Sequence, residues 1–432
     1  MTGFHALIGV EEAVRRVLEF VPVKSLEVEC VSLEDSVGRV CGVDIVSPAD
    51  VPEFDRAAVD GYAVRSRDVS GASATNPVRL VVVGTSFPGD DPSLLPEVAE
   101  NTCVEIMTGG PVPKGADAVV MAEHCVRVGG YIDVLKQVHP YQNISRRGED
   151  YRVGEVVVRK GTKLRPWHVA ALASLNVTKV PVFRKLRVGV MSTGSELVEP
   201  GTKPRPGQTL NSSKPMLKAL LAEHGCEALD YGTIGDDFNL IVSRIREALT
   251  NVDMLIVTGG TSVGERDLVP EAVNAAGEPG IIFHGVRMRP GKPTGVGVVD
   301  GKPVIMVSGM PVAALIGFTV FVKPLIERFY GAVGEPPCKL RARLSRRVTN
   351  LVGYRSYMRV KVVYEDGEYI VHPLMLTGSG LLSTLTKANA ILVIPEDVEG
   401  YDEGEEVEVE LLEKPVRGGT EKWQSYTTGL SH

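Results

Sequence analysis

Between residues 187 and 330 the sequence alternates short apolar runs with segments of helical periodicity. Runs such as RVGVMST, MLIVTGG and PVIMVSG are typical of buried strands, and the segments between them have the period of helices. Because parallel strands are joined by crossover helices, this alternation predicts an α/β domain with a mainly parallel sheet. In such sheets ligands bind beyond the carboxyl ends of the strands, where loops and helix N-termini converge.

The predicted strand ends carry polar or glycine-rich loops. They are STGSE (192–196), GDD (235–237), TGGTSVGERD (258–267), RPGKP (289–293) and SGMP (308–311). A single glycine turn would more simply be a tight strand-to-helix connection. Several such loops at one edge of the sheet instead favour an anion-binding site.

The loop TGGTSVGERD combines features that a phosphate loop normally keeps apart. Its glycines 259, 260 and 264 can expose backbone amides to an anion, but the loop ends in Asp267. A loop that binds a nucleoside triphosphate alone would end in Lys followed by Ser or Thr. Because a carboxylate repels phosphate unless a metal ion lies between them, the loop predicts a ligand that brings both phosphate and metal.

Three acids lie at or near predicted strand ends, and two cations flank a Pro-Gly turn. Glu196, Asp236 and Asp267 are oxygen ligands that suit Mg²⁺, although each alone could equally be a helix cap or a solvated acid. Arg289 and Lys292 are expected to contact phosphate. The eight histidines have no spacing typical of a zinc site.

The overall composition excludes several classes of protein. With 432 residues, 44% of them hydrophobic, the chain can build several domains. A net charge of −7 argues against a protein whose main partner is nucleic acid. Six cysteines without a C-x-x-C pair suit reduced thiols, and no apolar run approaches the roughly 20 residues that span a bilayer. We therefore expect a soluble, cytoplasmic protein without nucleic-acid or membrane partners.

The segments before the α/β domain are predicted to fold separately. Residues 1–20 predict an amphipathic helix with Val14, Val17 and Leu18 on one face. Residues 73–141 contain strand-like runs broken by Gly and Pro, which predicts a small β-rich domain. Residues 150–181 predict a hairpin around GEVVVRKGTKL and then a helix that begins near Pro166.

The segment after the α/β domain is also predicted to be β-rich. Asp366-Gly367 lies between two alternating apolar runs, which is a strong hairpin signal. We expect a C-terminal β-domain from about residue 335 to residue 413. The tail after it has neither periodicity nor enough apolar residues to pack, and it is expected to be mobile.

Three motifs upstream place polar residues at tight turns. FDRAAVDGYAV (54–64) carries Asp60, IMTGGPVPKGADAVV (106–120) carries Thr108, and RRGED (146–150) ends in Asp150. Each alone could be a well-made turn. Taken in order with STGSEL and with TGGTSVGERD followed by RPGKP, they resemble the molybdopterin molybdenumtransferase family, the molybdenum insertases related to the E domain of gephyrin. The resemblance runs from about residue 8 to residue 413.

The resemblance implies a multidomain α/β plus β subunit that forms a homodimer. A three-layer α/β molybdopterin-binding domain with a mainly parallel sheet would comprise residues 1–27 and 182–332. A small mixed linking domain would comprise 28–50 and 145–181, and a β-rich arm domain 51–144. A C-terminal β-barrel-like domain would comprise 335–413, followed by a mobile tail at 414–432.

The resemblance also implies a reaction. Members bind adenylylated molybdopterin and molybdate, release AMP with a divalent metal such as Mg²⁺, and leave molybdenum on the dithiolene. Contacts with the adenylyltransferase and with molybdoenzymes would be transient. The residues at matching positions that would act in catalysis are Asp60, Glu196, Asp236 and Asp267, of which the last three would hold Mg²⁺. The residues that would bind substrate are Thr108, Asp150, Thr193, Gly259, Gly260, Ser262, Gly264, Arg289, Lys292 and Pro311.

Four positions depart from the family's motifs. Ala57 and Val59 replace Ser and Met in S-A-M-D-G-Y-A, which leaves the acid and the turn intact. Met310 and Ala313 replace Asn and Ser in G-N-P-V-S-A, which removes two hydrogen-bonding side chains.

Two other functions stay open at this point. One is the adenylyltransferase that makes the adenylylated pterin, although the single α/β unit and the Asp60 motif favour insertion. The other is a non-catalytic pterin-binding scaffold, against which the short tail and the lack of long linkers count. No covalent nucleophile is expected, because no His or Lys partner is predictable beside Ser192 or Thr193. Molybdate and tungstate are not distinguished, since both are tetrahedral dianions of nearly equal size.

Overall fold

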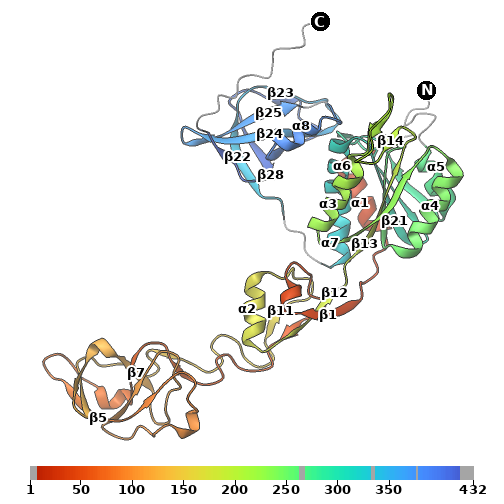
Figure 1. The fold of residues 1–432 in the computed structure, drawn as a ribbon. Helices are drawn as coiled ribbons and strands as arrows, with labels where there is room; N and C mark the ends of the chain where they lie inside the picture. Colours follow the sequence, from red (N-terminus) through yellow and green to blue (C-terminus); the bar gives the residue numbers. More distant parts are fainter. Residues whose placement is uncertain (1–6, 262–267, 332–335, 376–377, 419–432) are drawn as a thin grey trace. The chain divides into compact units, whose positions relative to one another are not determined.

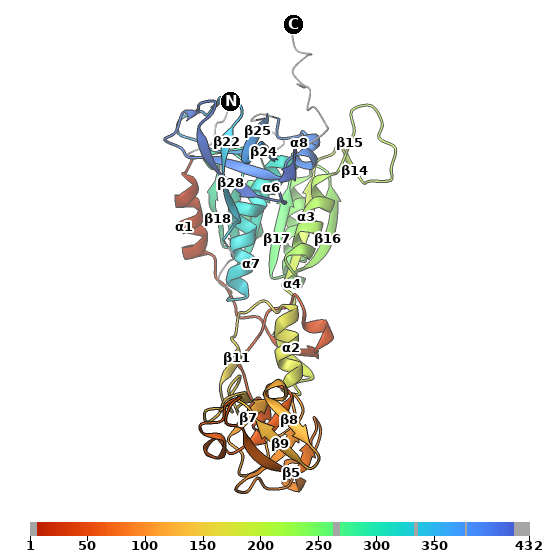
Figure 2. The same ribbon diagram turned by 90° about the vertical axis from the view of Figure 1, so that its left-hand side faces the viewer.

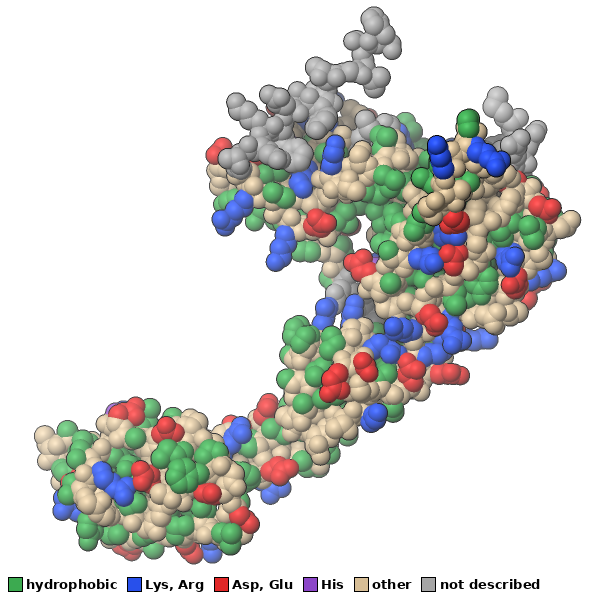
Figure 3. Space-filling model, viewed as in Figure 1, with side chains coloured by type: hydrophobic (Ala, Val, Ile, Leu, Met, Phe, Trp, Pro, Cys, Tyr) green, Lys and Arg blue, Asp and Glu red, His purple; other side chains and the backbone are tan. Residues whose placement is uncertain are grey.

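The structure is a computed structural model, and it describes residues 7–261, 268–331, 336–375 and 378–418. The chain divides into two compact units, Val28–Val182 and the combination of Met1–Glu27 with Phe183–His432 (Figure 1). Lys and Arg side chains are interspersed with Asp and Glu side chains over the face drawn in Figure 3. Within the described ranges, no helix is long and apolar enough to cross a membrane.

The larger unit contains a six-stranded sheet in the order β16-β13-β17-β21-β20-β18. Its strands are β13 (Arg187–Thr193), β16 (Glu227–Ile234), β17 (Met254–Thr258), β18 (Pro279–His284), β20 (Gly295–Val299) and β21 (Lys302–Val307). The first four strands of this order are parallel to their neighbours, whereas β20 is antiparallel to both β21 and β18. The predicted mainly parallel sheet is confirmed, and an antiparallel pair extends it at one end.

Helices cover both faces of this sheet and make it the middle of three layers (Figures 1 and 2). On one face lie α4 (Phe238–Asn251) and α5 (Val269–Ala276). On the other lie α3 (Ser213–Glu223), α6 (Pro311–Gly317) and α7 (Lys323–Phe329), with a π-helical turn between the last two. In α4 the Asp237 carboxylate caps the first turn by accepting the N–H of Leu240 at 2.9 Å. Ile241, Ile245 and Ala248 then recur at helical spacing and face the core.

The first helix, α1, spans Val10–Phe20 and packs near β18. Its buried residues are Val10, Ala13 and Val17, whereas Leu18 is 43% exposed. The amphipathic helix predicted over residues 1–20 is present only from Val10, because residues 7–9 are not helical and residues 1–6 lie outside the described residues. Of the three residues predicted to share one face, Val17 is buried but Leu18 does not belong to the buried stripe. The buried stripe follows spacings of three and four residues from Val10, and Leu18 lies beyond its edge.

The larger unit also contains a closed five-stranded β-barrel. Its strands are β22 (Lys339–Leu344), β24 (Arg355–Glu365), β25 (Glu368–Met375), β26 (Ala390–Ile394) and β28 (Glu406–Leu411), and the pairing of β24 with β26 closes it. The predicted hairpin joins β24 to β25, and both Asp366 and Gly367 have positive φ, as a tight two-residue turn requires. Smaller elements complete this region: α8 (Leu382–Lys387), β23 (Val348–Thr349), β27 (Gly400–Tyr401) and β29 (Val416–Arg417).

The smaller unit, Val28–Val182, contains a six-stranded sheet in the order β7-β4-β6-β5-β9-β8. Its strands are β4 (Gly61–Val64), β5 (Val78–Ser86), β6 (Thr102–Ile106), β7 (Ala118–Met121), β8 (Cys125–Val128) and β9 (Tyr131–Val134). The predicted β-rich segment is confirmed. The pair β3 (Arg56–Ala57) and β10 (Ile144–Ser145) adjoins this sheet, because Ala57 accepts from and donates to the loop after β6.

The rest of the smaller unit combines short strands with one helix. These elements are β1 (Val28–Ser32), β2 (Ile45–Val46), β11 (Val156–Val158), β12 (Lys179–Phe183) and α2 (Pro166–Ser174). The helix begins at Pro166 as predicted. The predicted hairpin around GEVVVRKGTKL is wrong: β11 pairs with β2, and Lys163 pairs with Val40. Both halves of the segment therefore pair with an earlier part of the chain. The alternation of apolar and polar residues within the segment does not indicate which strand it will pair with.

Candidate functional site

The register of the sheet brings the five predicted loops to one edge. The loops after β13, β16, β17 and β21 leave the same edge because these strands are parallel. RPGKP precedes β20, and since β20 is antiparallel to β21, it begins at that edge too. The loop TGGTSVGERD is described only as far as residue 261, so Ser262, Gly264 and Asp267 lie outside the described residues.

Three glycine backbones approach one another closely at this edge. Gly259 and Gly260 have φ of +91° and +57°. A Cβ atom on Gly259 would lie 2.3 Å from the Thr193 carbonyl oxygen, and one on Gly309 would lie 3.4 Å from the Gly259 Cα. Only glycine fits at Gly259, both for its backbone conformation and for this contact. The loops after β13, β17 and β21 are therefore lined by main chain rather than by side chains where they meet.

The hydroxyl of Thr193 lies beneath this glycine turn. A Cβ atom on Gly260 would lie 2.6 Å from the Thr193 Oγ1. Thr193 is only 2% exposed, and its hydroxyl has no hydrogen-bond partner among the described residues. Of the residues predicted to bind substrate, Thr193 thus supports the turn from below, whereas Gly259 and Gly260 form the turn itself.

Two of the three predicted metal ligands lie on loops that are bonded to each other. Glu196 is exposed, and its carboxylate folds back to within 2.8 Å of where a Cβ on Gly194 would lie. The Ser195 N–H donates to the Asp236 carboxylate at 3.3 Å, and the Asp236 N–H donates to the Ser195 hydroxyl at 3.0 Å. These two bonds join the loop after β13 to the loop after β16. Within the described ranges no group of three His, Cys, Asp or Glu side chains is placed to hold a metal, and the third predicted acid, Asp267, lies outside them.

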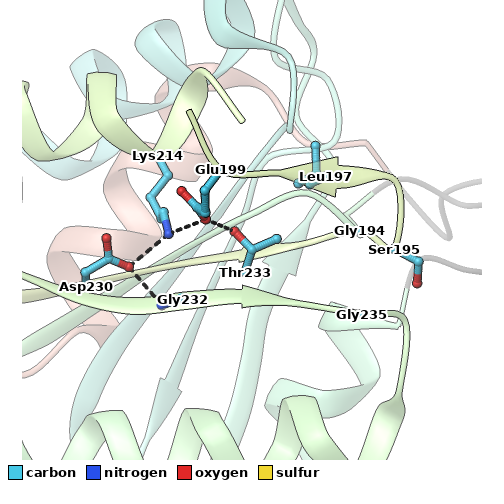
Figure 4. Close-up of a pocket in the computed structure, with 9 residues that line it drawn as sticks. All are labelled: Gly194, Ser195, Leu197, Glu199, Lys214, Asp230, Gly232, Thr233 and Gly235. Atoms are coloured by element: carbon cyan, nitrogen blue, oxygen red, sulfur yellow. Dashed lines mark hydrogen bonds and ion pairs between the residues drawn. The ribbon is translucent and has the colours of Figure 1, made fainter. Parts of the chain in front are cut away.

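A pocket of about 660 Å³ opens between the loops after β13 and β16 (Figure 4). Its lining comprises Gly194, Ser195, Leu197, Glu199, Lys214, Asp230, Gly232, Thr233 and Gly235. Lys214 extends from α3 between two carboxylates, at 2.7 Å from Glu199 and 3.0 Å from Asp230. The Thr233 hydroxyl donates to the same oxygen of Glu199. The pocket wall thus contains a cation whose charge is already balanced.

In this pocket wall, hydrogen bonds outweigh the effect of burial on the pKa values of three charged side chains. Burial would raise the pKa of Asp230, but hydrogen bonds from Lys218, the Gly232 N–H and Lys214 lower it to about 2. Burial likewise opposes the lowered pKa of Glu199 and the raised pKa of Lys214, and their mutual hydrogen bond prevails in both cases. All three groups are therefore charged at neutral pH.

Asn211, just before α3, and Ser213, its first residue, hydrogen-bond to several strand ends, a role that was not predicted from the sequence. Asn211 donates to the hydroxyls of Ser192 at 2.9 Å and Thr233 at 3.0 Å, and Ser213 donates to the Gly309 carbonyl at 2.8 Å. Asn211 and Ser213 are buried. Consecutive small polar residues before a helical segment are a capping signal, but their long-range partners cannot be found from local sequence.

The remaining predicted residues of the α/β domain lie on the same edge. Arg289 is half-buried, and its guanidinium has no hydrogen bond or ion pair within the described part of the chain. Lys292 is exposed, and Pro311 occupies the first turn of α6. Met310, where the family has Asn, precedes α6 without a side-chain cap; the Ser308 hydroxyl accepts its N–H at 3.2 Å instead.

The predicted residues of the arm lie in the smaller unit. Asp60 and Thr108 are hydrogen-bonded to each other, whereas the exposed Asp150 side chain has no hydrogen bond or ion pair among the described residues. The loop around Asp150 is organised by an acid that was not predicted from sequence. Asp50 accepts from Arg147 Nε at 2.7 Å and from the Val153 N–H at 3.0 Å.

Comparisons with known proteins agree along almost the whole chain. Residues 8–176 match the family model "MoeA N-terminal region (domain I and II)", 189–328 match "Probable molybdopterin binding domain", and 341–412 match "MoeA C-terminal region (domain IV)". A molybdopterin biosynthesis protein of Methanocaldococcus jannaschii is 40% identical over 89% of this chain and 92% of its own. The molybdopterin molybdenumtransferase of Staphylococcus aureus is 34% identical over 94% of this chain and 96% of its own.

Solved structures agree with these sequence matches. The crystal structure of the molybdopterin biosynthesis MoeA protein of Pyrococcus horikoshii is 36% identical and covers 95% of this chain and 100% of its own, with a TM-score of 0.80. A molybdenum cofactor biosynthesis protein of Pyrococcus furiosus is 27% identical and covers 94% of this chain and 100% of its own, with a TM-score of 0.58. The chain therefore belongs to the MoeA family, which includes proteins named molybdopterin molybdenumtransferase, and it is a transferase with a role in molybdenum cofactor biosynthesis.

Proposed function

We propose that the protein inserts molybdenum, or tungsten, into adenylylated molybdopterin and releases AMP in a Mg²⁺-dependent step. One observation supports this proposal most directly. In a member of the MoeA family, the main chain of Gly259, Gly260 and Gly309 converges at a sheet edge that is flanked by the acid-bearing loops of Glu196 and Asp236. Such an edge suits a ligand that brings a pyrophosphate together with a divalent metal.

The pyrophosphate of the substrate would lie against the glycine turn. Backbone amides there can donate to phosphate oxygens without any side chain in the way. Arg289, Lys292 and the start of α6 at Pro311 border the same edge. Arg289 is the residue best suited to bind the negatively charged pyrophosphate, because no group within the described residues balances the positive charge of its guanidinium.

Mg²⁺ fits the donor set at this edge. Glu196 and Asp236 supply hard oxygen ligands that reach solvent, and the Ser195 bonds hold their two loops together. Asp267 would be the third ligand by resemblance. Bound Mg²⁺ would neutralise the pyrophosphate and polarise a phosphorus–oxygen bond. The carboxylates would hold the metal and orient a water molecule, and no covalent nucleophile takes part.

Asp60, Thr108 and Asp150 would serve a second copy of the chain. These residues lie in the smaller unit, and the glycine edge lies in the larger one. An isologous dimer would let each copy complete the site of the other. Light scattering of the full chain at micromolar concentration is expected to give twice the mass of one chain, and a monomer would contradict this part of the proposal.

Anion-dependent release of AMP tests the proposed function against its alternatives. Purified protein with adenylylated molybdopterin, Mg²⁺ and molybdate is expected to release AMP, and omission of molybdate or chelation of Mg²⁺ is expected to stop it. An adenylyltransferase would instead consume ATP and form the adenylylated pterin. A pterin-binding scaffold would bind the substrate and release no AMP.

A further inference from the structure

Lys214 lines the pocket beside the proposed metal ligands, but the proposed function gives it no role. It is only 4% exposed, and two of the three N–H bonds of its ammonium group are directed to Glu199 and Asp230. Since its charge is balanced by these carboxylates, Lys214 is not placed to capture an anion from solution. Its contacts instead join α3 to a loop and to β16.

Of the two carboxylates bound to Lys214, Glu199 bears on the proposed metal ligand, because it lies three residues after Glu196 in the same segment. Inside this loop the Leu197 N–H donates to the Gly194 carbonyl, and the Glu196 carbonyl accepts the Thr209 N–H at 2.9 Å. The latter bond belongs to the short parallel pair of β14 (Leu197–Val198) and β15 (Thr209–Leu210).

The chain beyond Glu199 leaves the sheet. Residues 200–207 are exposed, and Figure 2 shows the connection between β14 and β15 extending away from the sheet. The Glu199 carboxylate is held from outside the loop by Lys214 and Thr233 (Figure 4). This pair of contacts therefore fastens the loop to the domain three residues after Glu196.

We infer that Lys214 is a positioning residue for the metal-binding loop: by fixing Glu199, it sets where Glu196 lies at the sheet edge. The inference rests on the proposed function, in which Glu196 holds the divalent metal. It goes further in assigning the geometry of that ligand to a buried lysine on α3.

A second lysine on the same helix provides a matched control. Lys218 donates to Asp230 at 2.9 Å but does not contact Glu199. After Lys214→Met, Asp230 keeps Lys218 and the Gly232 N–H, whereas Glu199 keeps only the Thr233 hydroxyl. After Lys218→Met, Glu199 is untouched. Both variants remove one positive charge, but only Lys214→Met releases the loop.

Binding of Mn²⁺ to the full chain, measured by the loss of the free-ion EPR signal, tests the inference without relying on turnover. Lys214→Met is expected to weaken Mn²⁺ binding by about tenfold, as loss of a group that orients a metal ligand typically does. Lys218→Met is expected to bind Mn²⁺ like the wild type. Lys214→Arg should recover most of the affinity, because a guanidinium can still bridge the two carboxylates.

The outcomes separate this inference from the proposed function. Unchanged Mn²⁺ binding in a folded Lys214→Met variant overturns the inference, as does an equal loss in Lys218→Met, which would indicate a general charge effect. A wild type that binds no Mn²⁺ overturns it as well. A wild type that binds Mn²⁺ but releases no AMP contradicts only the proposed function.

A second pair of variants keeps the test open if Lys214→Met does not fold. Glu199→Gln replaces the ion pair with Lys214 by a weaker hydrogen bond to a neutral amide, and it is expected to lower Mn²⁺ affinity in the same direction. Asp230→Asn removes the same charge from the cluster but leaves Glu199 bound to Lys214. A loss confined to Glu199→Gln supports the inference, and equal losses in both variants overturn it.

Discussion

The Asp60 carboxylate accepts both hydrogen bonds that Thr108 can donate to it, one from the backbone N–H and one from the hydroxyl, each at 2.7 Å. Asp60 directly precedes β4, and Thr108 lies just after β6, which pairs with β4 through Gly61 and Ile106. The two hydrogen bonds lower the pKa of Asp60. An exposed carboxylate is thus kept charged and oriented by the neighbouring strand.

Asp60→Asn is expected to lower the rate of AMP release by about a hundredfold, the scale of a lost general acid or base, while thermal unfolding stays near that of the wild type. Thr108→Val should lose less, because the backbone N–H still orients the carboxylate. The control is Asp133→Asn, which breaks an ion pair with Arg79 on the same sheet and should leave the rate unchanged. Full activity of Asp60→Asn would remove this residue from the reaction.

The glycine turn predicts two different responses to alanine. Gly260→Ala should destabilise the protein by about 2 kcal/mol, from its positive φ and from contact with Thr193 Oγ1. Thr193→Ala in the same chain should restore part of this loss, because it removes the contacting atom. Gly259→Ala should not be rescued by Thr193→Ala, since its close contact is with the Thr193 backbone carbonyl. Differential scanning calorimetry of the four variants measures these differences, and equal rescue of both glycine variants would contradict the described contacts.

Arg289 is expected to bind the pyrophosphate of the substrate. Arg289→Ala should weaken equilibrium binding of adenylylated molybdopterin by about tenfold at low salt, and by less at high salt, because salt screens a charge pair that solvent can reach. Arg287→Ala is the matched control, since this arginine is exposed, lies two residues earlier and likewise has no side-chain ion pair among the described residues. If the two variants lose affinity equally, the loss reflects the general positive charge of this region and not a direct contact of Arg289 with the pyrophosphate.

Asp230 predicts a defined dependence of stability on pH. Its pKa is lowered in the folded protein from its usual 3.8 to about 2. Its charged form therefore stabilises the folded state above about pH 4, and this contribution is lost as the pH falls toward 2. Chemical unfolding of the wild type and of Asp230→Asn should differ most near neutral pH and converge between pH 4 and pH 2. A constant difference over this range would mean that the Asp230 charge does not stabilise the fold.

Much of the fold follows from patterns that are local in the sequence. The apolar runs of β13, β17 and β21 were predicted because buried parallel strands are continuous in hydrophobicity. The hairpin at Asp366-Gly367 was predicted because its turn needs two residues with positive φ. The error at residues 154–164 has the opposite cause, since β11 pairs with a strand more than a hundred residues earlier.

In the candidate site, too, local sequence predicted some features, whereas others depend on contacts between distant parts of the chain. Its loops could be predicted, because parallel strands bring their carboxyl ends to one edge. The contact of Lys214 with Glu199 and Asp230 could not be predicted from the sequence. These three residues come from separate parts of the chain and meet only after the sheet and α3 have packed. Sequence also did not reveal that Thr193 lies beneath the glycine turn, because a polar residue at a strand end would usually face the ligand.

Under the proposed function, loss of AMP and insertion of the metal occur at one site in one reaction. A single-turnover experiment with adenylylated molybdopterin, Mg²⁺ and molybdate measures this coupling. AMP is quantified by chromatography and pterin-bound molybdenum by mass spectrometry. We expect one AMP to be released for each molybdenum bound, at equal rates, and neither product to form without molybdate. Release of AMP at the same rate without molybdate, or from a protein that leaves the pterin free of molybdenum, would contradict it.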